Sequence, residues 1–338
     1  MFRGNAAHTG VATGTGPTGE PAPTPVGQLG ETASSPVIVN GVLYVGGLDG
    51  SVYAVHLGSG DVRWQFQTGD AISSSPALSN GVIYAGSNNG SLYALDAATG
   101  KEIWRFASQA SIASSPTVVG NVVYIGSWDG YLYALNARTG KELWRFAIGA
   151  EIFASPAVAN GLVYIGGVDG ALHAVQAKDG VERWQTDVGA SLNSSPAVVD
   201  GRVYVGGGNG ALVALDATTG AQAWEVPIGD RISSSPAVAN GVVYIGGDTG
   251  VLYAVNATTG AVRWQADTGG EIFASPAVTS TSVIIANLDG DVVALATSNG
   301  AEQWRYAADA PVYSSPIVVG QNVFIIARDG TITDLAGP

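Results

Sequence analysis

Residues 74–104 read SSPALSNGVIYAGSNNGSLYALDAATGKEIW, and this stretch is one complete copy of a unit that recurs along the whole chain. The unit starts with a Ser-Pro pair and closes with a tryptophan. A fixed period of this size is the signature of a repeat architecture, so it outweighs the two domains that a length of 338 residues would otherwise suggest. The prolines of the Ser-Pro pairs stand 40 residues apart, at Pro36, Pro76, Pro116, Pro156, Pro196, Pro236, Pro276 and Pro316.

Each unit predicts four short strands. The first strand follows the Ser-Pro pair and ends in a two-residue turn such as Asn80-Gly81, which is the strongest short-range signal for a β-hairpin. In the next unit, the three remaining strands are expected at residues 123–125, 132–135 and 143–146. Strands of this length, joined by short turns, predict an antiparallel meander.

The apolar pattern of the middle strands decides between all-β architectures. Residues 162–165 (Leu-Val-Tyr-Ile) are apolar on both faces, whereas a sandwich strand with one wet face alternates. Each sheet must therefore be covered on both faces. The last strand does alternate, with Trp104 and Phe106 on one side and Arg105 on the other, as suits an outermost strand. We predict an all-β, eight-bladed β-propeller with four antiparallel strands in each blade.

The two ends of the chain are expected to complete one blade together. The last unit stops after its third strand, at residues 331–335. Residues 22–27 can supply the missing outer strand, with Thr24 in the place of the tryptophan and Val26 matched to Phe66. This pairing would close the ring. We therefore expect an irregular N-terminal arm over residues 1–21 and a single propeller domain over residues 22–338.

The composition excludes several classes of function. Charged residues make up 12% of the chain, about half the usual share, and the net charge is −13 with no run of Lys or Arg. These features argue against nucleic acid or an anionic membrane surface as a partner. There is no cysteine, hence no thiolate nucleophile or disulfide framework. No stretch approaches the ~20 apolar residues that span a membrane.

Candidate binding residues emerge when the eight units are compared with one another. The residues five and three before each Ser-Pro proline, and the residue twelve after it, vary between units. Because strands alternate in direction, both loop types should emerge on one face, around the mouth of the axial channel, where loops on a rigid frame usually bind. The predicted site comprises the aromatic residues Trp128, Phe153, Phe273 and Tyr313 and the polar residues Glu151, Asn193, Arg231, Glu271 and Arg328.

A simpler interpretation of the same residues stays open. The aromatic side chains can merely plug the axis while the charges form a solvated rim. Glu151 and Glu271 could in principle act as an acid/base pair, but they stand three blades apart. The Asp-Gly turns each offer a single carboxylate, whereas calcium takes 6–8 oxygen ligands, so we predict no metal site and no catalytic residue.

The segment from Ala94 to Trp104, ALDAATGKEIW, resembles the tryptophan-docking motif of the pyrroloquinoline-quinone (PQQ) repeat family. The opening residues 1–10 also resemble the start of such proteins. The resemblance covers essentially the whole chain and implies an eight-bladed propeller in which each tryptophan docks between blades. The docking residues would be Trp64, Trp104, Trp144, Trp184, Trp224, Trp264 and Trp304.

The resemblance implies more than one function. The family includes quinoprotein alcohol dehydrogenases, but also a propeller lipoprotein of outer-membrane assembly and sensor propellers of bacterial kinases. The dehydrogenases carry insertions that build a calcium and quinone pocket, typically with a vicinal disulfide. This chain has minimal units and no cysteine. We therefore expect a non-catalytic binding or scaffold module without a cofactor.

The alternatives are a PQQ- and calcium-dependent dehydrogenase and an engineered, highly regular propeller without an evolved ligand. By the same resemblance, we expect a monomer outside the cytoplasm, with any leader removed. Its partner would be a protein or a small ligand.

Overall fold

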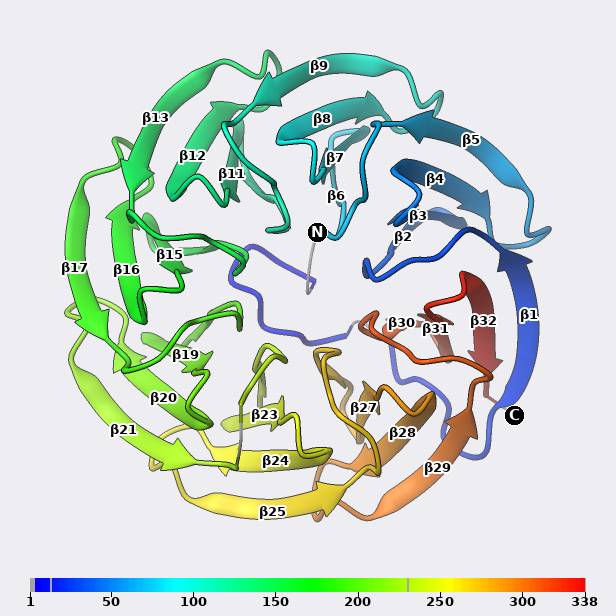
Figure 1. Ribbon diagram of the computed structural model, residues 1–338. Coiled ribbons are helices and arrows are strands. Elements are labelled where there is room, and N and C mark those ends of the chain that lie inside the picture. Colours follow the sequence, from blue (N-terminus) through cyan, green and yellow to red (C-terminus); the bar gives the residue numbers. More distant parts are fainter. Residues whose placement is uncertain (1–3, 13, 230, 338) are drawn as a thin grey trace.

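A computed structural model describes residues 4–12, 14–229 and 231–337. Its strands form eight four-stranded antiparallel sheets, arranged as blades around a central axis (Figure 1). The eight-bladed propeller expected from the repeat is therefore confirmed. Blade 1 comprises strands β2 to β5, each later blade takes the next four strands, and blade 8 comprises β30, β31, β32 and β1.

Within each blade, the four strands are ordered from the axis outward. The innermost strands are β2 (Val37–Val39), β6 (Ala77–Ser79), β10 (Thr117–Val119), β14 (Ala157–Ala159), β18 (Ala197–Val199), β22 (Ala237–Ala239), β26 (Ala277–Val278) and β30 (Ile317–Val319). The second strands are β3 (Val42–Gly46), β7 (Val82–Gly86), β11 (Val122–Gly126), β15 (Leu162–Gly166), β19 (Arg202–Gly206), β23 (Val242–Gly246), β27 (Ser282–Ala286) and β31 (Asn322–Ile326). The third strands are β4 (Ser51–His56), β8 (Ser91–Asp96), β12 (Tyr131–Asn136), β16 (Ala171–Gln176), β20 (Ala211–Asp216), β24 (Val251–Asn256), β28 (Asp291–Ala296) and β32 (Thr331–Ala336). The outermost strands are β5 (Val62–Gln67), β9 (Glu102–Ala107), β13 (Glu142–Ala147), β17 (Glu182–Asp187), β21 (Gln222–Pro227), β25 (Val262–Asp267), β29 (Glu302–Ala307) and β1 (Ala22–Gln28).

The turn between the first two strands of a blade follows from its residue types. In blade 2, Asn80 and Gly81 have φ values of 49° and 75°. Two consecutive positive φ values define the type I′ turn, whose twist matches that of the flanking strands. Asn and Gly tolerate this left-handed backbone better than other residues do.

The ring closes where β1 pairs antiparallel with β32, at the right of Figure 1. Thr24 lies opposite Asp334, as Trp64 lies opposite Ala54 in blade 1, so the expected position of Thr24 is confirmed. The match of Val26 to Phe66 is wrong by one residue. A shift in register between Pro25 and Gly27 places Gly27, not Val26, opposite Ile332. A bulge accommodates Pro25 at the sheet edge, where the residue that follows it is left unpaired.

Tryptophan side chains cross between neighbouring blades. The indole N–H of Trp184 donates a hydrogen bond of 3.1 Å to the carbonyl oxygen of Ala217 in the next blade. The hydroxyl of Tyr164 donates to the same oxygen at 3.0 Å, and burial raises the pKa of Tyr164 to about 12, so this donor stays protonated. Equivalent bonds run from Trp64 to Ala97, Trp104 to Ala137, Trp144 to Ala177, Trp224 to Ala257 and Trp264 to Thr297, while Trp304 donates to Pro17.

The serines of the Ser-Pro pairs form a closed ring of hydrogen bonds around the axis. In each case the backbone N–H of one serine donates to the hydroxyl oxygen of the serine one blade further on, at 2.9–3.1 Å. The last bond joins Ser315 to Ser35 and so crosses from blade 8 to blade 1. We call this set the serine ring; its members are Ser35, Ser75, Ser115, Ser155, Ser195, Ser235, Ser275 and Ser315.

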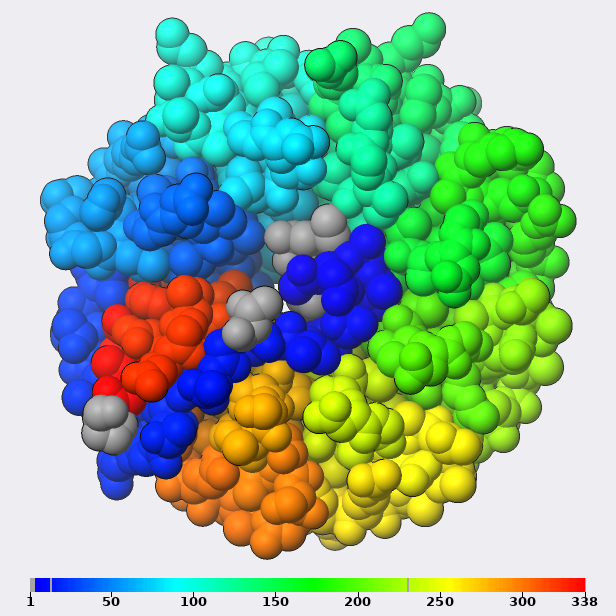
Figure 2. All heavy atoms as spheres, turned by 180° about the vertical axis from the view of Figure 1, so that it is seen from behind, coloured from blue at the N-terminus to red at the C-terminus, as the bar shows by residue number. Residues whose placement is uncertain are grey.

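Residues 4–21 form the arm, apart from residue 13, which lies outside the described residues. Figure 2 shows the arm in blue across the centre of one face, leaving the axis between the orange blade 7 and the red blade 8. Carbonyl oxygens of Ala6, Ala7, Thr9 and Gly10 accept hydrogen bonds from the innermost strands of blades 4 to 7. His8 is buried, and its ring nitrogen Nε2 lies 3.0 Å from the hydroxyl of Thr117 in blade 3. The arm therefore covers half of one end of the axial channel.

Candidate functional site

The loops around the channel mouth lie on one face, opposite the arm. In every blade the backbone N–H twelve residues after the Ser-Pro proline donates to the carbonyl oxygen five residues before it, at 2.7–3.0 Å. Trp128, for example, donates to Ser111, and Arg328 donates to Pro311. The arm instead meets turns at the other end of the innermost strands, such as that at Gly320. We call the ring formed by these eight loop pairs the rim.

One sector of the rim holds an aromatic pair. The ring centroids of Trp128 in blade 3 and Phe153 in the loop before blade 4 are 4.7 Å apart, with planes tilted by 45°. Such a tilted, close pair is a favourable aromatic arrangement. Asn193 lies in the loop before blade 5, and its side chain is partly buried.

A second sector combines aromatic rings with a cation. Phe273 and Tyr313 have ring centroids 5.8 Å apart, and the guanidinium of Arg328 lies 5.3 Å from the centre of the Tyr313 ring. Arg328 also donates a hydrogen bond of 3.3 Å to the Tyr313 hydroxyl. A further nitrogen of Arg328 lies 3.9 Å from Glu31, a residue outside the predicted set. Three predicted residues, Phe273, Tyr313 and Arg328, are thus brought together.

The three remaining predicted residues are not brought together. Glu151, Arg231 and Glu271 are exposed, and within the described ranges none of them forms an ion pair. The two glutamates belong to loops of different sectors, before blades 4 and 7. A shared acid/base role for Glu151 and Glu271 has no support in this arrangement.

Among the described residues of the rim, three carry a buried polar side-chain atom that has no hydrogen-bond partner within the protein. These atoms are the side-chain oxygen of Asn88, the indole nitrogen of Trp128 and the side-chain oxygen of Asn193. An unpaired buried polar group costs about 1–3 kcal/mol, so native proteins keep few of them. Asn88 is not among the predicted site residues, although it holds the position in blade 2 that Trp128 holds in blade 3.

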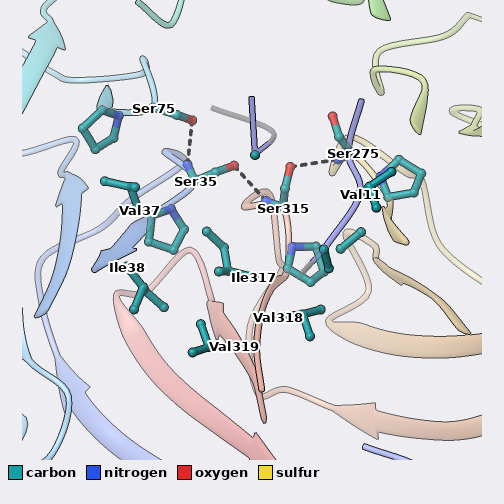
Figure 3. Close-up of a pocket in the computed structure, with 18 of the residues that line it drawn as sticks. Val11, Ser35, Val37, Ile38, Ser75, Ser275, Ser315, Ile317, Val318 and Val319 are labelled. Carbon is teal, nitrogen blue, oxygen red and sulfur yellow. Dashed lines mark hydrogen bonds between the residues drawn. The ribbon is translucent and has the colours of Figure 1, made fainter. Parts of the chain in front are cut away.

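The channel holds a second candidate site, which the sequence did not predict. A cavity of about 340 Å³ lies beside the arm, between the innermost strands of blades 1 and 8 (Figure 3). We call it the channel cavity. None of the nine predicted binding residues lines it. Its sequence signal is weak, because its walls are backbone edges, prolines and short apolar residues that every unit repeats.

Away from both sites, the described residues include a titratable cluster in which only the histidine is buried. It centres on His173, whose ring nitrogens lie 2.8 Å from Glu182 and 3.3 Å from Asp169. His173 takes the place that Tyr133 holds in blade 3, where the tyrosine hydroxyl donates to Asp129 at 2.7 Å. The cluster therefore maintains a contact within blade 4 that a tyrosine makes elsewhere.

The described residues do not gather a set of side chains that fits a calcium ion. Calcium takes 6–8 oxygen ligands, and within the described ranges no three His, Asp or Glu side chains gather in a way that could hold a metal ion. The rim carboxylates of Glu151 and Glu271 stand apart, as described above. We therefore derive no chemical step through such a group.

The fold and the repeats define a β-propeller of the PQQ-repeat class. The chain belongs to the family described as outer membrane protein assembly factor BamB, whose model matches residues 48–191, 128–230, 169–273 and 248–337. No curated protein sequence matches the chain significantly. Within the described ranges, there is no helix that is long and apolar enough to cross a membrane.

Solved structures with the same fold come from proteins of different kinds. BamB from Moraxella catarrhalis is 22% identical with a TM-score of 0.79, over 93% of this chain and 98% of that chain. The computationally designed Ika8 protein is 16% identical with a TM-score of 0.81, over 92% and 99%. A europium-containing methanol dehydrogenase is also 16% identical with a TM-score of 0.81, over 98% and 88%. At these identities the likeness shows the fold alone.

Proposed function

We propose that this protein is a non-catalytic scaffold that binds a protein segment or a small ligand at the rim. The observation that carries the proposal is the set of unpaired buried polar atoms on Asn88, Trp128 and Asn193. A ligand that supplies hydrogen-bond partners for these atoms would recover free energy that the unliganded protein lacks. The neighbouring Trp128–Phe153 pair offers an apolar surface for the same ligand.

The family membership supports the scaffold function over an enzymatic one. The matching model describes an assembly factor, and the described residues gather no metal-ligand set. We also propose that the protein is a monomer. We propose that it acts outside the cytoplasm, because the family is described by its part in outer membrane assembly. Light scattering of the purified protein and fractionation of cells that express it would test these two points.

A single substitution tests the rim. Trp128→Phe keeps an aromatic ring but removes the unpaired indole N–H. We expect the unliganded variant to be more stable by about 1 kcal/mol and to bind a rim ligand about tenfold more weakly. Thermal unfolding measures the first effect, and titration with hits from a screen of sugars and uncharged peptides measures the second. A purely structural Trp128 would not produce the two effects in opposite directions.

A matched control and the enzymatic alternative complete this test. Leu48→Ala changes the equivalent rim position of blade 1 and should leave ligand affinity within about twofold. Hits whose affinity is unchanged by both Trp128→Phe and Asn193→Ala would place the binding site elsewhere. Dye-linked alcohol oxidation after addition of PQQ and calcium would overturn the non-catalytic assignment.

A further inference from the structure

The arm shows how the innermost strands bind an extended segment. At blade 7, the N–H of Val278 donates to Gly10 at 3.0 Å, and the N–H of Ala12 donates to the carbonyl oxygen of Val278 at 2.8 Å. Val11 stands opposite Val278 in this short parallel bridge. The same position in blades 4, 5 and 6 donates its N–H to the arm at 2.6–2.9 Å. The binding uses backbone groups, and the arm places small residues there.

Among the residues that the structure describes, the equivalent backbone groups of the other four blades have no such partner. In blade 1, Ile38 lies opposite Leu43, between the two pairs that bond β2 to β3, so its N–H and carbonyl group point away from the sheet. The equivalent residues are Leu78 in blade 2, Val118 in blade 3 and Val318 in blade 8. Within the described ranges, the N–H groups of these four residues form no hydrogen bond. Edge strands of this kind are templates for the pairing of a further segment.

The channel cavity brings two of these free edges together. Its walls include Ile38 from blade 1 and Ile317, Val318 and Val319 from blade 8, with Val11 of the arm as a further wall (Figure 3). The serine ring runs along one side of it (Figure 3). Among the residues that the structure describes, no charged side chain lines the cavity, so a charged occupant would lose its hydration without compensation. The volume of about 340 Å³ lies within the range of ligand sites.

We propose that the channel cavity binds an extended, uncharged segment of a partner protein, which adds to the free edges of β2 and β30. Its backbone would bridge Ile38 or Val318 as residues 10–12 of the arm bridge Val278. Strand addition of this kind derives affinity from main-chain hydrogen bonds and specificity from the side chains that point into pockets. The preferred segment therefore resembles Gly-Val-Ala, with small residues on either side of one β-branched residue. This site is separate from the rim and does not depend on the function proposed there.

A blocked, fluorescent peptide with the sequence of residues 4–12 is the probe. Anisotropy titration should show saturable binding to the wild-type protein. Val319→Asp places a carboxylate at a position that lines the cavity and is 42% exposed, so the fold should tolerate it. We expect this variant to bind the peptide about tenfold more weakly or worse, because the charge loses water when the peptide enters. A peptide with Asp in place of its valine should fail to bind the wild type for the same reason.

The repeat supplies a matched control. Val119 holds the equivalent position in blade 3, is 39% exposed and does not line the cavity, so Val119→Asp should leave peptide affinity within about twofold. Trp128→Phe, on the opposite face, should also leave it unchanged, which separates this test from that of the rim. Absence of saturable binding to the wild type overturns the proposal. Equal effects of Val319→Asp and Val119→Asp, or no effect of Val319→Asp, also overturn it.

Discussion

The contact between blades 4 and 5 differs from the contact between blades 8 and 1, which we call the seam. At the first, the indole of Trp184 packs on Gly220, and the tryptophan and Tyr164 both donate hydrogen bonds to Ala217. At the seam, the tryptophan position holds Thr24 and the tyrosine position holds Phe324, which has no hydroxyl. The seam therefore lacks an indole and two hydrogen bonds that the other contact has.

Backbone contacts take over at the seam. A side chain on Gly60 would overlap the carbonyl oxygen of Val26, so β1 approaches blade 1 where an indole stands elsewhere. Within blade 8, the side-chain amide of Gln28 donates to the carbonyl oxygen of Asp329 at 2.7 Å, and its side-chain oxygen accepts a hydrogen bond from the hydroxyl of Thr331 at 2.8 Å, which holds β1 in its own blade. The comparison teaches that a close backbone approach replaces the tryptophan contact at the seam, while main-chain pairing with β32 holds β1 in blade 8.

Loss of a tryptophan contact should reduce the free energy of unfolding more than any other change at these two contacts. Trp184→Ala removes a buried indole and its hydrogen bond, and we expect a loss of about 3–5 kcal/mol in the free energy of unfolding. Thr24→Ala changes the equivalent, exposed position at the seam and should cost less than about 0.5 kcal/mol. Urea unfolding followed by circular dichroism measures both. Similar losses for the two variants would contradict the distinction.

Crowding the seam should have the next largest effect. Gly60 has a φ of 74° and contacts β1, so Gly60→Ala adds left-handed strain of about 1–2 kcal/mol to a steric overlap of similar size. Gly41 has a φ of 73° with open space around it, so Gly41→Ala isolates the strain alone. Amide exchange in β1 and β32 should increase in Gly60→Ala only. If the two variants unfold alike, β1 does not pack on Gly60.

The serine ring allows the two contacts to be compared through one type of bond. Ser195→Ala leaves the buried N–H of Ser155 without a partner, at an expected cost of about 1–3 kcal/mol. Ser35→Ala does the same to Ser315 at the seam, where the partly exposed Ser35 site admits water, so we expect less than about 1 kcal/mol. Thermal unfolding of both variants checks the order. A larger loss of stability for Ser35→Ala than for Ser195→Ala would show that the seam excludes water as well as the other contacts do.

A pH dependence inside blade 8, where β1 pairs with β32, should be the smallest effect. Asp334 stands where Ala54 stands in blade 1, and burial raises its pKa, while hydrogen bonds from Asn322 partly oppose that rise. The folded protein therefore holds this proton more tightly than the unfolded chain, so the contribution to stability is present below about pH 4 and is lost as the pH rises through the folded pKa.

The variant Asp334→Asn should not show that loss. Relative to the wild type, we expect it to gain a few tenths of a kcal/mol between pH 3.5 and pH 6, a small change because Asp334 is only partly buried. Melting temperatures of both proteins across this range provide the measurement. A stability difference that does not change with pH would mean that Asp334 titrates as it does in the unfolded chain.

Much of the fold could be predicted because the unit repeats. The spacing of Pro76 and its equivalents indicated eight blades, and the missing fourth strand of the last unit correctly assigned β1 to blade 8. The register error at Val26 arose because counting residues assumes a regular strand, whereas Pro25 is followed by a bulge. The contacts of the arm could not be predicted, since they use carbonyl groups that every residue carries.

The site could be predicted only in part. Comparison of the units located rim positions, and the backbone bonds of Trp128 and Arg328 confirm that both loop types lie on one face. The sequence does not give the distances between side chains of neighbouring blades, and these distances decide which residues touch. Tyr313 and Arg328 are in contact, whereas Glu151 and Glu271 are not. The channel cavity could not be predicted because Ile38 and Val318 are ordinary strand residues whose role depends on where the arm stops.

The arm also reduces the number of equivalent orientations in which a ligand could bind at the axis of a symmetric ring. A guest entering a ring of eight equal sectors can settle in eight equivalent poses, a degeneracy worth about 1.2 kcal/mol by RT ln 8. Because the arm fills the sectors of blades 4 to 7, the remaining ones are no longer interchangeable, and each has a different neighbour. A ligand bound near the axis can therefore have one preferred orientation relative to the blades.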